Sequence, residues 1–258
     1  MPSISRQRIT TPLEKGGDGI GCYDGQHWEI SDCIIDFSAC DLEDIDECCD
    51  IVNGSSATFR RCVIRGGGKL VLCGTGDDEK VPLETGKRVS FYDCILEDFG
   101  RRGPEVQDGM QVDMHNCLIR NWGDPDRFTV RNFGSWAHNG GRIDAFGCIY
   151  WQDSFWRPIR QFIADICDHI GQAWNDEGFK GLLRPSTYMP GVCKGLLATD
   201  GGEAYAWQCY RNHWWIALPW RHTTAMMDKT DALCMKRYLE NMAAELEKEL
   251  PREGTNAA

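Results

Sequence analysis

The stretch Arg60-Arg61-Cys62-Val63-Ile64 decides the fold, because four other stretches of the chain share its pattern of residue types. In most of them two polar residues precede a cysteine and two apolar residues follow it. The other four are Ser31-Asp32-Cys33-Ile34-Ile35, Tyr92-Asp93-Cys94-Ile95-Leu96, His115-Asn116-Cys117-Leu118-Ile119 and Phe146-Gly147-Cys148-Ile149-Tyr150. Successive cysteines of this series are 29, 32, 23 and 31 residues apart. Spacing of this size is typical of a solenoid, in which each unit buries its apolar face against its neighbours.

These units have the composition of short β-strands. They are rich in β-branched residues and bounded by Gly and Asp, and no long helical pattern separates them. We therefore expect an all-β fold, a right-handed parallel β-helix with a column of stacked cysteines in its interior. We also expect an added helical segment after residue 153 and a C-terminal amphipathic helix.

The same patterns divide the chain of 258 residues into four parts. Residues 1–17 are polar and predict an N-terminal arm, and residues 18–152 hold the repeating coils. Residues 153–227 are expected to form a helical insertion followed by one last coil. Residues 228–258 are expected to form the C-terminal helix and tail.

Two segments in the second half of the chain have helical spacing of their apolar residues. The first lies between Ile159 and Ile170, close behind Pro158. The second is residues 229–250, in which one stripe contains Leu239, Met242, Leu246 and Leu250. We expect this second helix to cover an open end or a flank of the solenoid.

Composition narrows the classes of partner. The formal net charge of −11 argues against nucleic acid, and no segment approaches the length of an apolar membrane span. No apolar run of the signal-peptide type follows Met1, so we expect no export route from the sequence itself. Fourteen cysteines would suggest disulfides in a secreted protein, but their periodicity fits small buried side chains, and we expect mostly free thiols.

The densest acidic run is Asp41-Leu42-Glu43-Asp44-Ile45-Asp46-Glu47-Cys48-Cys49-Asp50. Asp46 and Asp50 flank two cysteines and lead into a strand that ends at Gly54-Ser55. Carboxylates gathered at a strand edge make the hard oxygen site that Ca²⁺ prefers. A solvated acidic loop has the same composition, so the run alone leaves both interpretations open.

Three linked motifs resemble the pectate lyases of polysaccharide lyase family 1. Asp46-Glu47-Cys48-Cys49-Asp50-Ile51-Val52-Asn53-Gly54-Ser55 is similar to the family segment Asp-Gly-Leu-Ile-Asp-Val-x-x-Gly-Ser. Lys69-Leu70-Val71-Leu72-Cys73-Gly74-Thr75-Gly76-Asp77 is similar to Lys-x-x-Leu-x-Gly-x-x-Asp. Asp18-Gly19-Ile20 followed by Trp28-Glu29-Ile30-Ser31-Asp32-Cys33 resembles Asp-Ala-Ile followed by Val-Trp-Ile-Asp-His-Cys. The ordered match covers residues 18–152.

The resemblance implies a Ca²⁺-dependent lyase that acts on an acidic polysaccharide such as polygalacturonate. It implies that Asp18, Asp46 and Asp50 hold Ca²⁺ and that Lys69 binds the carboxylate of the substrate. A bound cation would also bridge an acidic protein and an acidic sugar. Without the resemblance, Lys69 reads as an ordinary lysine at a strand edge.

The family's third signature, Gln-Arg-x-Pro-x-x-Arg-x-Gly, resembles Asp126-Arg127-Phe128-Thr129-Val130-Arg131-Asn132-Phe133-Gly134 after a one-residue slip. The resemblance implies that Arg127 is the catalytic base and that Arg131 binds substrate. The internal proline of the family is missing here, and residues 135–141 look like an insertion. The alternative interpretation makes Arg127 a salt-bridge partner of Asp124 or Asp126.

The implied reaction is an anti β-elimination. Ca²⁺ would withdraw charge from the uronate carboxylate, Arg127 would take the proton from the adjacent ring carbon, and the glycosidic oxygen would leave without water. A guanidinium is ordinarily protonated, so this base needs neighbouring positive charge to lower its pKa. We therefore expect the highest activity at alkaline pH.

The chain departs from the family before Asp18, where members carry further coils and a capping helix and this sequence has seventeen residues. An uncapped solenoid end predicts a cover, supplied by the N-terminal arm, a second copy or a larger assembly. The family suggests an extracellular protein, and the missing export signal also suits a virion-associated one. The rival interpretation is a non-catalytic β-helix module that binds carbohydrate or serves assembly.

Overall fold

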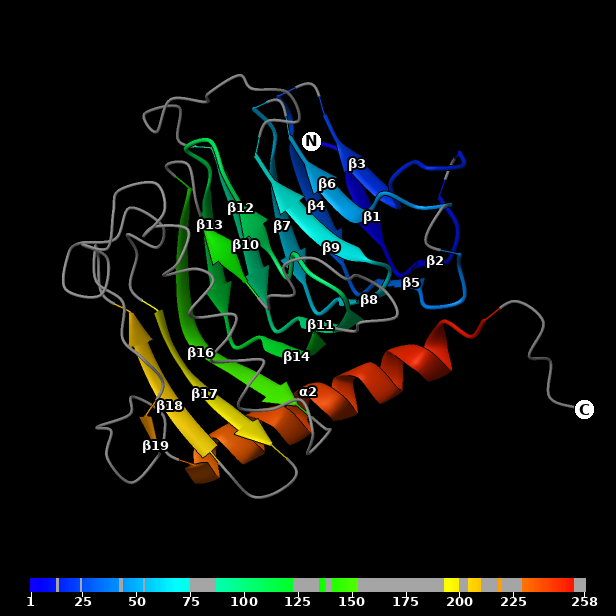
Figure 1. Ribbon diagram of the computed structural model, residues 1–258. Helices are drawn as coiled ribbons and strands as arrows, with labels where there is room; N and C mark the ends of the chain where they lie inside the picture. The colour runs from blue at the N-terminus through cyan, green and yellow to red at the C-terminus, as the bar shows by residue number, and fades with distance from the viewer. Residues whose placement is uncertain are drawn as a thin grey trace, which may run out of the picture.

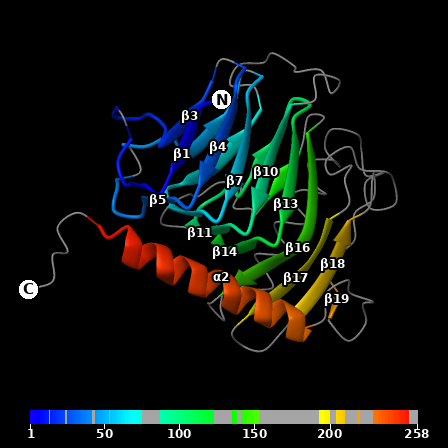
Figure 2. The ribbon, with the colours of Figure 1, turned by 180° about the vertical axis from the view of Figure 1, so that it is seen from behind.

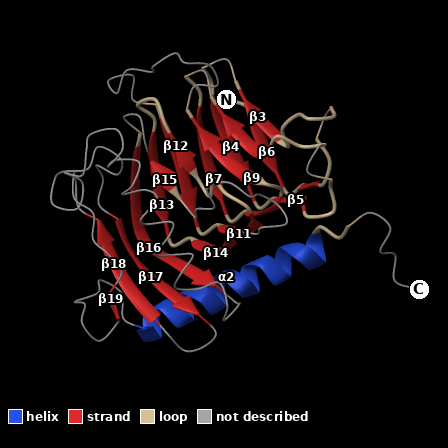
Figure 3. Cartoon of the chain, viewed as in Figure 1, coloured by secondary structure: helices blue, strands red, loops and turns tan. Residues whose placement is uncertain are grey.

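A computed structural model describes residues 1–122, 135–137, 141–152, 193–199, 204–209, 218–219 and 229–252, apart from residues 13, 24, 42, 43, 53 and 75–86. Figure 3 shows that strands dominate these residues, with one helix, α2 (Lys229–Glu249), beside them. Most strand pairs are parallel, which confirms the expected class of a mostly parallel β-fold.

The strands form three parallel ladders that the chain visits in turn (Figure 1). Ladder 1 consists of β1 (Ser3–Ser5), β4 (His27–Ser31), β7 (Ser56–Arg60), β10 (Arg88–Tyr92), β13 (Gln111–His115) and the first part of β16 (Arg142–Gln152). Ladder 2 consists of β2 (Arg8–Ile9), β5 (Ile34–Phe37), β8 (Val63–Gly66), β11 (Ile95–Phe99), β14 (Leu118–Trp122) and the last part of β16. Ladder 3 consists of β3 (Ile20–Cys22), β6 (Glu47–Ile51), β9 (Lys69–Cys73), β12 (Glu105–Val106) and β15 (Trp136–Ala137).

Each periodic cysteine lies at the corner between ladder 1 and ladder 2. The residue before it adopts the left-handed backbone conformation, with φ of +52° at Asp32, +53° at Arg61 and Asp93, +54° at Asn116 and +64° at Gly147. This conformation bends the chain while its backbone bonds continue between coils, as in the bond from the Asp32 amide to the Arg60 carbonyl at 2.9 Å. The two polar residues and the cysteine of the repeat therefore specify one recurrent corner.

The cysteines of the repeat are buried, and none of them is in a disulfide bond. Cys33, Cys62, Cys94, Cys117 and Cys148 are all 0 % exposed. The thiol of Cys62 donates to the carbonyl oxygen of Arg60 at 3.3 Å, and that of Cys117 donates to the carbonyl of His115 at 3.3 Å. The expectation of free thiols is thus confirmed for the cysteines whose side chains the structure describes.

The segment expected to be an N-terminal arm supplies a first coil. Ile4 lies opposite Ile30 in ladder 1, and Ile9 lies opposite Ile35 in ladder 2. The corner between them has Arg6 with φ of +53°, but Gln7 occupies the position that a cysteine holds in later coils. The cysteine pattern could not reveal this coil for that reason.

Helix α2 covers the outer face of ladder 2 (Figure 2). Its buried side chains Leu239, Met242 and Leu246 pack on a row of apolar residues, one from each successive coil. That row consists of Ile34, Val63, Ile95, Leu118 and Ile149. The expected amphipathic helix on a flank of the β-structure is therefore confirmed.

The last strands depart from the coil pattern. β17 (Cys193–Thr199) pairs parallel with β16, but β18 (Ala204–Cys209) runs antiparallel to β17, and β19 (Leu218–Pro219) runs antiparallel to β18. A further coil would have run parallel, so β18 and β19 do not form the last coil expected within residues 153–227. The helical segment expected between Ile159 and Ile170 lies outside the described residues. No helix of the described residues is long and apolar enough to span a membrane.

Candidate functional site: an acidic cluster at the start of ladder 3

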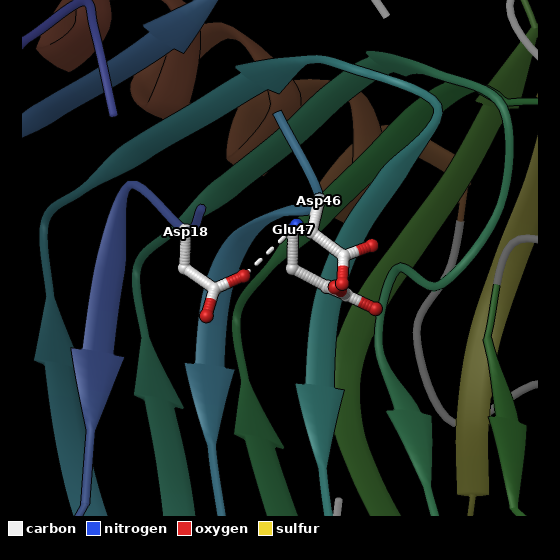
Figure 4. Close-up of side chains that lie close together, drawn as sticks. All are labelled: Asp18, Asp46 and Glu47. Carbon is white, nitrogen blue, oxygen red and sulfur yellow. Dashed lines mark hydrogen bonds between the residues drawn. The ribbon is translucent and has the colours of Figure 1, made fainter. Parts of the chain in front are cut away.

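Three carboxylates converge where the strands of ladder 3 begin (Figure 4). Asp18 lies two residues before β3, Asp46 directly precedes β6, and Glu47 is the first residue of β6. One oxygen atom of each lies within 4.8 Å of the others, an arrangement that could hold a metal ion. Parallel pairing produces this convergence, since it aligns equivalent ends of successive strands at one edge.

Asp18 is held on both of its oxygen atoms. Its Oδ1 accepts a hydrogen bond from the backbone amide of Glu47 at 3.0 Å, and its Oδ2 accepts one from the Tyr23 hydroxyl at 2.6 Å. The tight approach of this segment to β6 requires Gly19, because a Cβ there would lie 2.7 Å from the carbonyl oxygen of Cys48. The Tyr23 ring lies over Gly21, where a Cβ would lie 2.2 Å from the ring. Two glycines thus allow Asp18 to reach the cluster.

Two cationic side chains lie against the carboxylates. The Nζ atom of Lys69, the first residue of β9, contacts Asp46 and lies 3.6 Å from Glu47 Oε1. The guanidinium of Arg102 contacts Glu47, and its Nε lies 2.8 Å from Glu105 Oε2. Glu47 is opposite Lys69 in the register, and Lys69 is bridged to Arg101, so an acidic position of β6 is followed along the ladder by two basic positions.

Burial changes the protonation behaviour of this cluster. Burial raises the pKa of Glu47 to about 7; the charge of Arg102 opposes the rise, and Asp50 and Asp18 add to it. Burial also raises the pKa of Asp50 to about 7, with a further contribution from Asp18. Burial lowers the pKa of Lys69 to about 8, and the neighbouring charges of Arg102 and Arg101 lower it further. Each shift is away from the charged form.

The excess of acidic groups fits a cation. Five carboxylates meet three basic side chains here: Asp18, Asp46, Glu47, Asp50 and Glu105 against Lys69, Arg101 and Arg102. With all eight ionised, the cluster carries two surplus negative charges. Oδ1 of Asp50 is shielded from solvent and has no hydrogen-bond partner among the described residues. Carboxylate oxygens are hard ligands, so the closest group of three could hold a metal ion, and Asp50 lies outside that group.

The structure places the sequence-predicted residues in different ways. Asp18 and Asp46 lie close together, and Lys69 contacts Asp46. Asp50 lies further along β6, opposite Gly21 and Leu72, and does not belong to the closest group of three, in which Glu47 takes part instead. Arg127 and Arg131 lie outside the described residues.

Sequence reasoning missed Glu47 and Arg102, although the coil spacing contained a signal for both. Glu47 follows Asp18 by 29 residues, the distance from Cys33 to Cys62. Arg101 follows Lys69 by 32 residues, the distance from Cys62 to Cys94. Residues one coil apart occupy neighbouring strands, so these intervals placed Glu47 beside Asp18 and the Arg101-Arg102 pair beside Lys69.

No protein-family model, curated protein or solved structure matches the chain.

Proposed function

We propose that the protein is a Ca²⁺-dependent lyase that binds a uronate-containing glycan and cleaves it by β-elimination. The observation that carries the proposal is the convergence of Asp18, Asp46 and Glu47 with Lys69 at one edge of ladder 3. The succession of three parallel ladders, visited in turn, supports a right-handed parallel β-helix as the scaffold.

The side chains of the cluster divide between two tasks. Asp18, Asp46 and Glu47, with Asp50 behind them, would hold the Ca²⁺. When bound, Ca²⁺ supplies positive charge that acidifies the proton next to the uronate carboxylate. Lys69 binds the substrate carboxylate and fixes the orientation of the sugar. Arg127, in its neutral form, would accept the proton from the ring carbon, as the family resemblance implies. The electron pair of that C–H bond forms the ring double bond, and the glycosidic oxygen leaves with the departing sugar and takes a proton from solvent.

The test is a lyase assay on polygalacturonate at alkaline pH, following the ultraviolet absorbance of the unsaturated product. We expect product in Ca²⁺ and none after chelation. Lys69→Ala should lower kcat/KM by about 100-fold, because it removes a charge that contacts the substrate. Lys15→Ala is the matched control, since Lys15 pairs with exposed Asp44 at 2.8 Å.

A non-catalytic glycan-binding module is the second candidate. It is favoured by the ion pairs that already engage Lys69 and Arg102 with carboxylates of the cluster. Binding of polygalacturonate without any unsaturated product, in the presence of Ca²⁺, would establish this second candidate and refute the lyase.

A further inference from the structure

Two of the three clustered carboxylates already have a cationic partner from the protein. Lys69 contacts Asp46, and Arg102 contacts Glu47. A divalent cation held by the cluster would therefore compete with these side chains for the same carboxylate groups. The Coulomb attraction between a cation and a carboxylate grows with the charge of the cation and falls with distance. At equal distance a doubly charged ion is therefore attracted more strongly than the singly charged side chain.

Lys69 and Arg102 differ in the ion-pair contacts that each would keep after a divalent cation took its carboxylate. Arg102 keeps a second partner, because its Nε lies 2.8 Å from Glu105, which is 5 % exposed at its side chain. Among the described residues Lys69 has no comparable second contact: its next carboxylate is Glu47 at 3.6 Å, itself a member of the cluster. Displacement would therefore leave Arg102 in place and free the ammonium of Lys69.

We propose that Lys69 is an internal counter-ion, which occupies Asp46 in the absence of a divalent cation and is released by that cation to bind an anionic ligand. This inference rests on the proposed function, since it concerns the same cluster and a carboxylate-bearing sugar. It adds an order of events, in which the divalent cation binds first and the glycan carboxylate second. It also assigns Arg102 a positioning role, as the cation that stays beside Glu105.

The exposure of the groups makes this exchange sterically simple. The side chain of Asp46 is 50 % exposed and that of Lys69 is 24 % exposed, so an ion can reach their contact from solvent. Lys69 starts β9, and its backbone is fixed by pairing with Glu47 and Arg101. Only its flexible side chain needs to move, while the strand stays in register.

The experiment is a calorimetric titration of metal-free protein with CaCl₂ at constant ionic strength. Wild type is compared with Lys69→Gln, Lys69→Met and Lys15→Gln. If Lys69 competes with the ion, both Lys69 variants should bind Ca²⁺ about tenfold more tightly than wild type. Lys15→Gln removes the same charge from the Lys15–Asp44 pair, and Asp44 lies two residues before Asp46 in the acidic run. This variant should change the affinity for Ca²⁺ by less than about twofold.

The outcomes separate this inference from the proposed function. Unchanged or weaker Ca²⁺ binding by the Lys69 variants, with wild type still binding, overturns the counter-ion role and leaves the Ca²⁺ site standing. An equal gain in Lys15→Gln also overturns it, because net charge would then explain the effect. No binding by wild type or by either Lys69 variant overturns the Ca²⁺ site itself, and the inference with it. Thermal melts confirm that each variant is folded.

Discussion

At the scale of single residues, the backbone conformation at the corner between ladders 1 and 2 recurs in successive coils. Asp32, Arg61, Asp93 and Asn116 all adopt positive φ values, which cost free energy for residues that carry a Cβ. Asp and Asn tolerate this conformation better than most residues. Three of these four positions, Asp32, Asp93 and Asn116, therefore hold residue types that tolerate the backbone conformation of the corner.

Asn116→Val should destabilise the protein by about 1–3 kcal/mol, because a β-branched residue is strongly disfavoured at a φ of +54°. The free energy of unfolding in urea measures the effect. Asn116→Gly is the control: it loses the same contact from Nδ2 to Asp93 Oδ1 at 3.4 Å but tolerates the backbone. Equal destabilisation by both variants would show that the side-chain contact matters and the backbone does not.

The equivalent positions of the cysteines in successive coils were predictable, because a residue type that recurs at a regular spacing of this size marks one position in a structural repeat. The first coil was not predictable in this way. Its corner has the same backbone conformation at Arg6, but Gln7 breaks the residue pattern. Backbone conformation is thus repeated more faithfully here than residue identity, and a search by residue type finds only part of the repeat.

At the scale of elements, the docking of α2 combines apolar packing with ion pairs. Beside the apolar row, ladder 2 carries Asp36, Arg65, Glu97 and Arg120 at successive register positions. Helix residues extend this row of alternating charge, with Glu240 placed 3.0 Å from Arg120 and Glu247 in contact with Arg65. The helix is therefore fixed in register along the ladder as well as held against it.

Asp36 should make this region sensitive to acid. Burial would raise its pKa, but hydrogen bonds from Arg65, Ser38 and Arg252 outweigh burial and hold the pKa of Asp36 below its usual range. A carboxylate with a lowered folded pKa stabilises the fold above its unfolded pKa of about 4, and this contribution is lost as pH falls below that value. Asp36→Asn should therefore lose less free energy of unfolding between pH 5 and pH 2, on the order of 1–3 kcal/mol less than wild type.

Urea unfolding at several pH values measures this difference. Asp32→Asn is the matched control, because Asp32 pairs with Arg61 at 2.8 Å in an ion pair that is 33 % and 41 % exposed. Exposed pairs contribute little, so this variant should follow the wild-type profile closely. A pH profile of Asp36→Asn that coincides with wild type would exclude Asp36 as a source of acid sensitivity.

Helix α2 was the most predictable element, because its stripe from Leu239 to Leu246 follows helical spacing without interruption. The ion pairs that fix its position were not predictable, since they join residues more than a hundred positions apart, such as Arg65 and Glu247. The antiparallel turn of β18 was also missed, because residues 204–209 resemble a coil strand in composition and direction leaves no trace in sequence.

At the scale of the whole molecule, the acidic surplus at the start of ladder 3 should link stability to divalent cations. A cation that binds only the folded state at about 100 times its dissociation constant adds about 2.7 kcal/mol of stability. For a chain of this size, that corresponds to a rise in Tm of about 5–10 °C. We expect this rise in Ca²⁺ for wild type.

Differential scanning calorimetry of chelator-treated protein, with and without CaCl₂, measures the shift. Asp46→Asn should lose most of it, because Asp46 belongs to the group of three. Asp44→Asn is the control from the same acidic run, since Asp44 instead pairs with Lys15. A rise that persists unchanged in Asp46→Asn would place the bound ion elsewhere on the molecule.

The candidate site was predictable in part. Asp18, Asp46 and Lys69 were identified from motifs, and the parallel ladders bring them together. Glu47 and Arg102 were missed because a motif compares residues along the chain, whereas their contact crosses neighbouring strands. Reading residues one coil apart as neighbours would have found them.

The contacts of α2 also determine how the molecule comes apart. A solenoid of independent coils frays from its ends, since each coil holds only its neighbours. Here Arg8, in the first coil, bonds the carbonyl of Leu250 at 2.6 Å, while Arg120, four coils further on, pairs with Glu240. Helix α2 therefore connects the first coil to coils further along the chain. If the first coil unfolds, the contact of Arg8 with Leu250 is lost, and the last turn of the helix becomes less stable. We therefore expect these coils to unfold in a single cooperative event. We also expect them to complete folding only after helix α2 has docked on ladder 2.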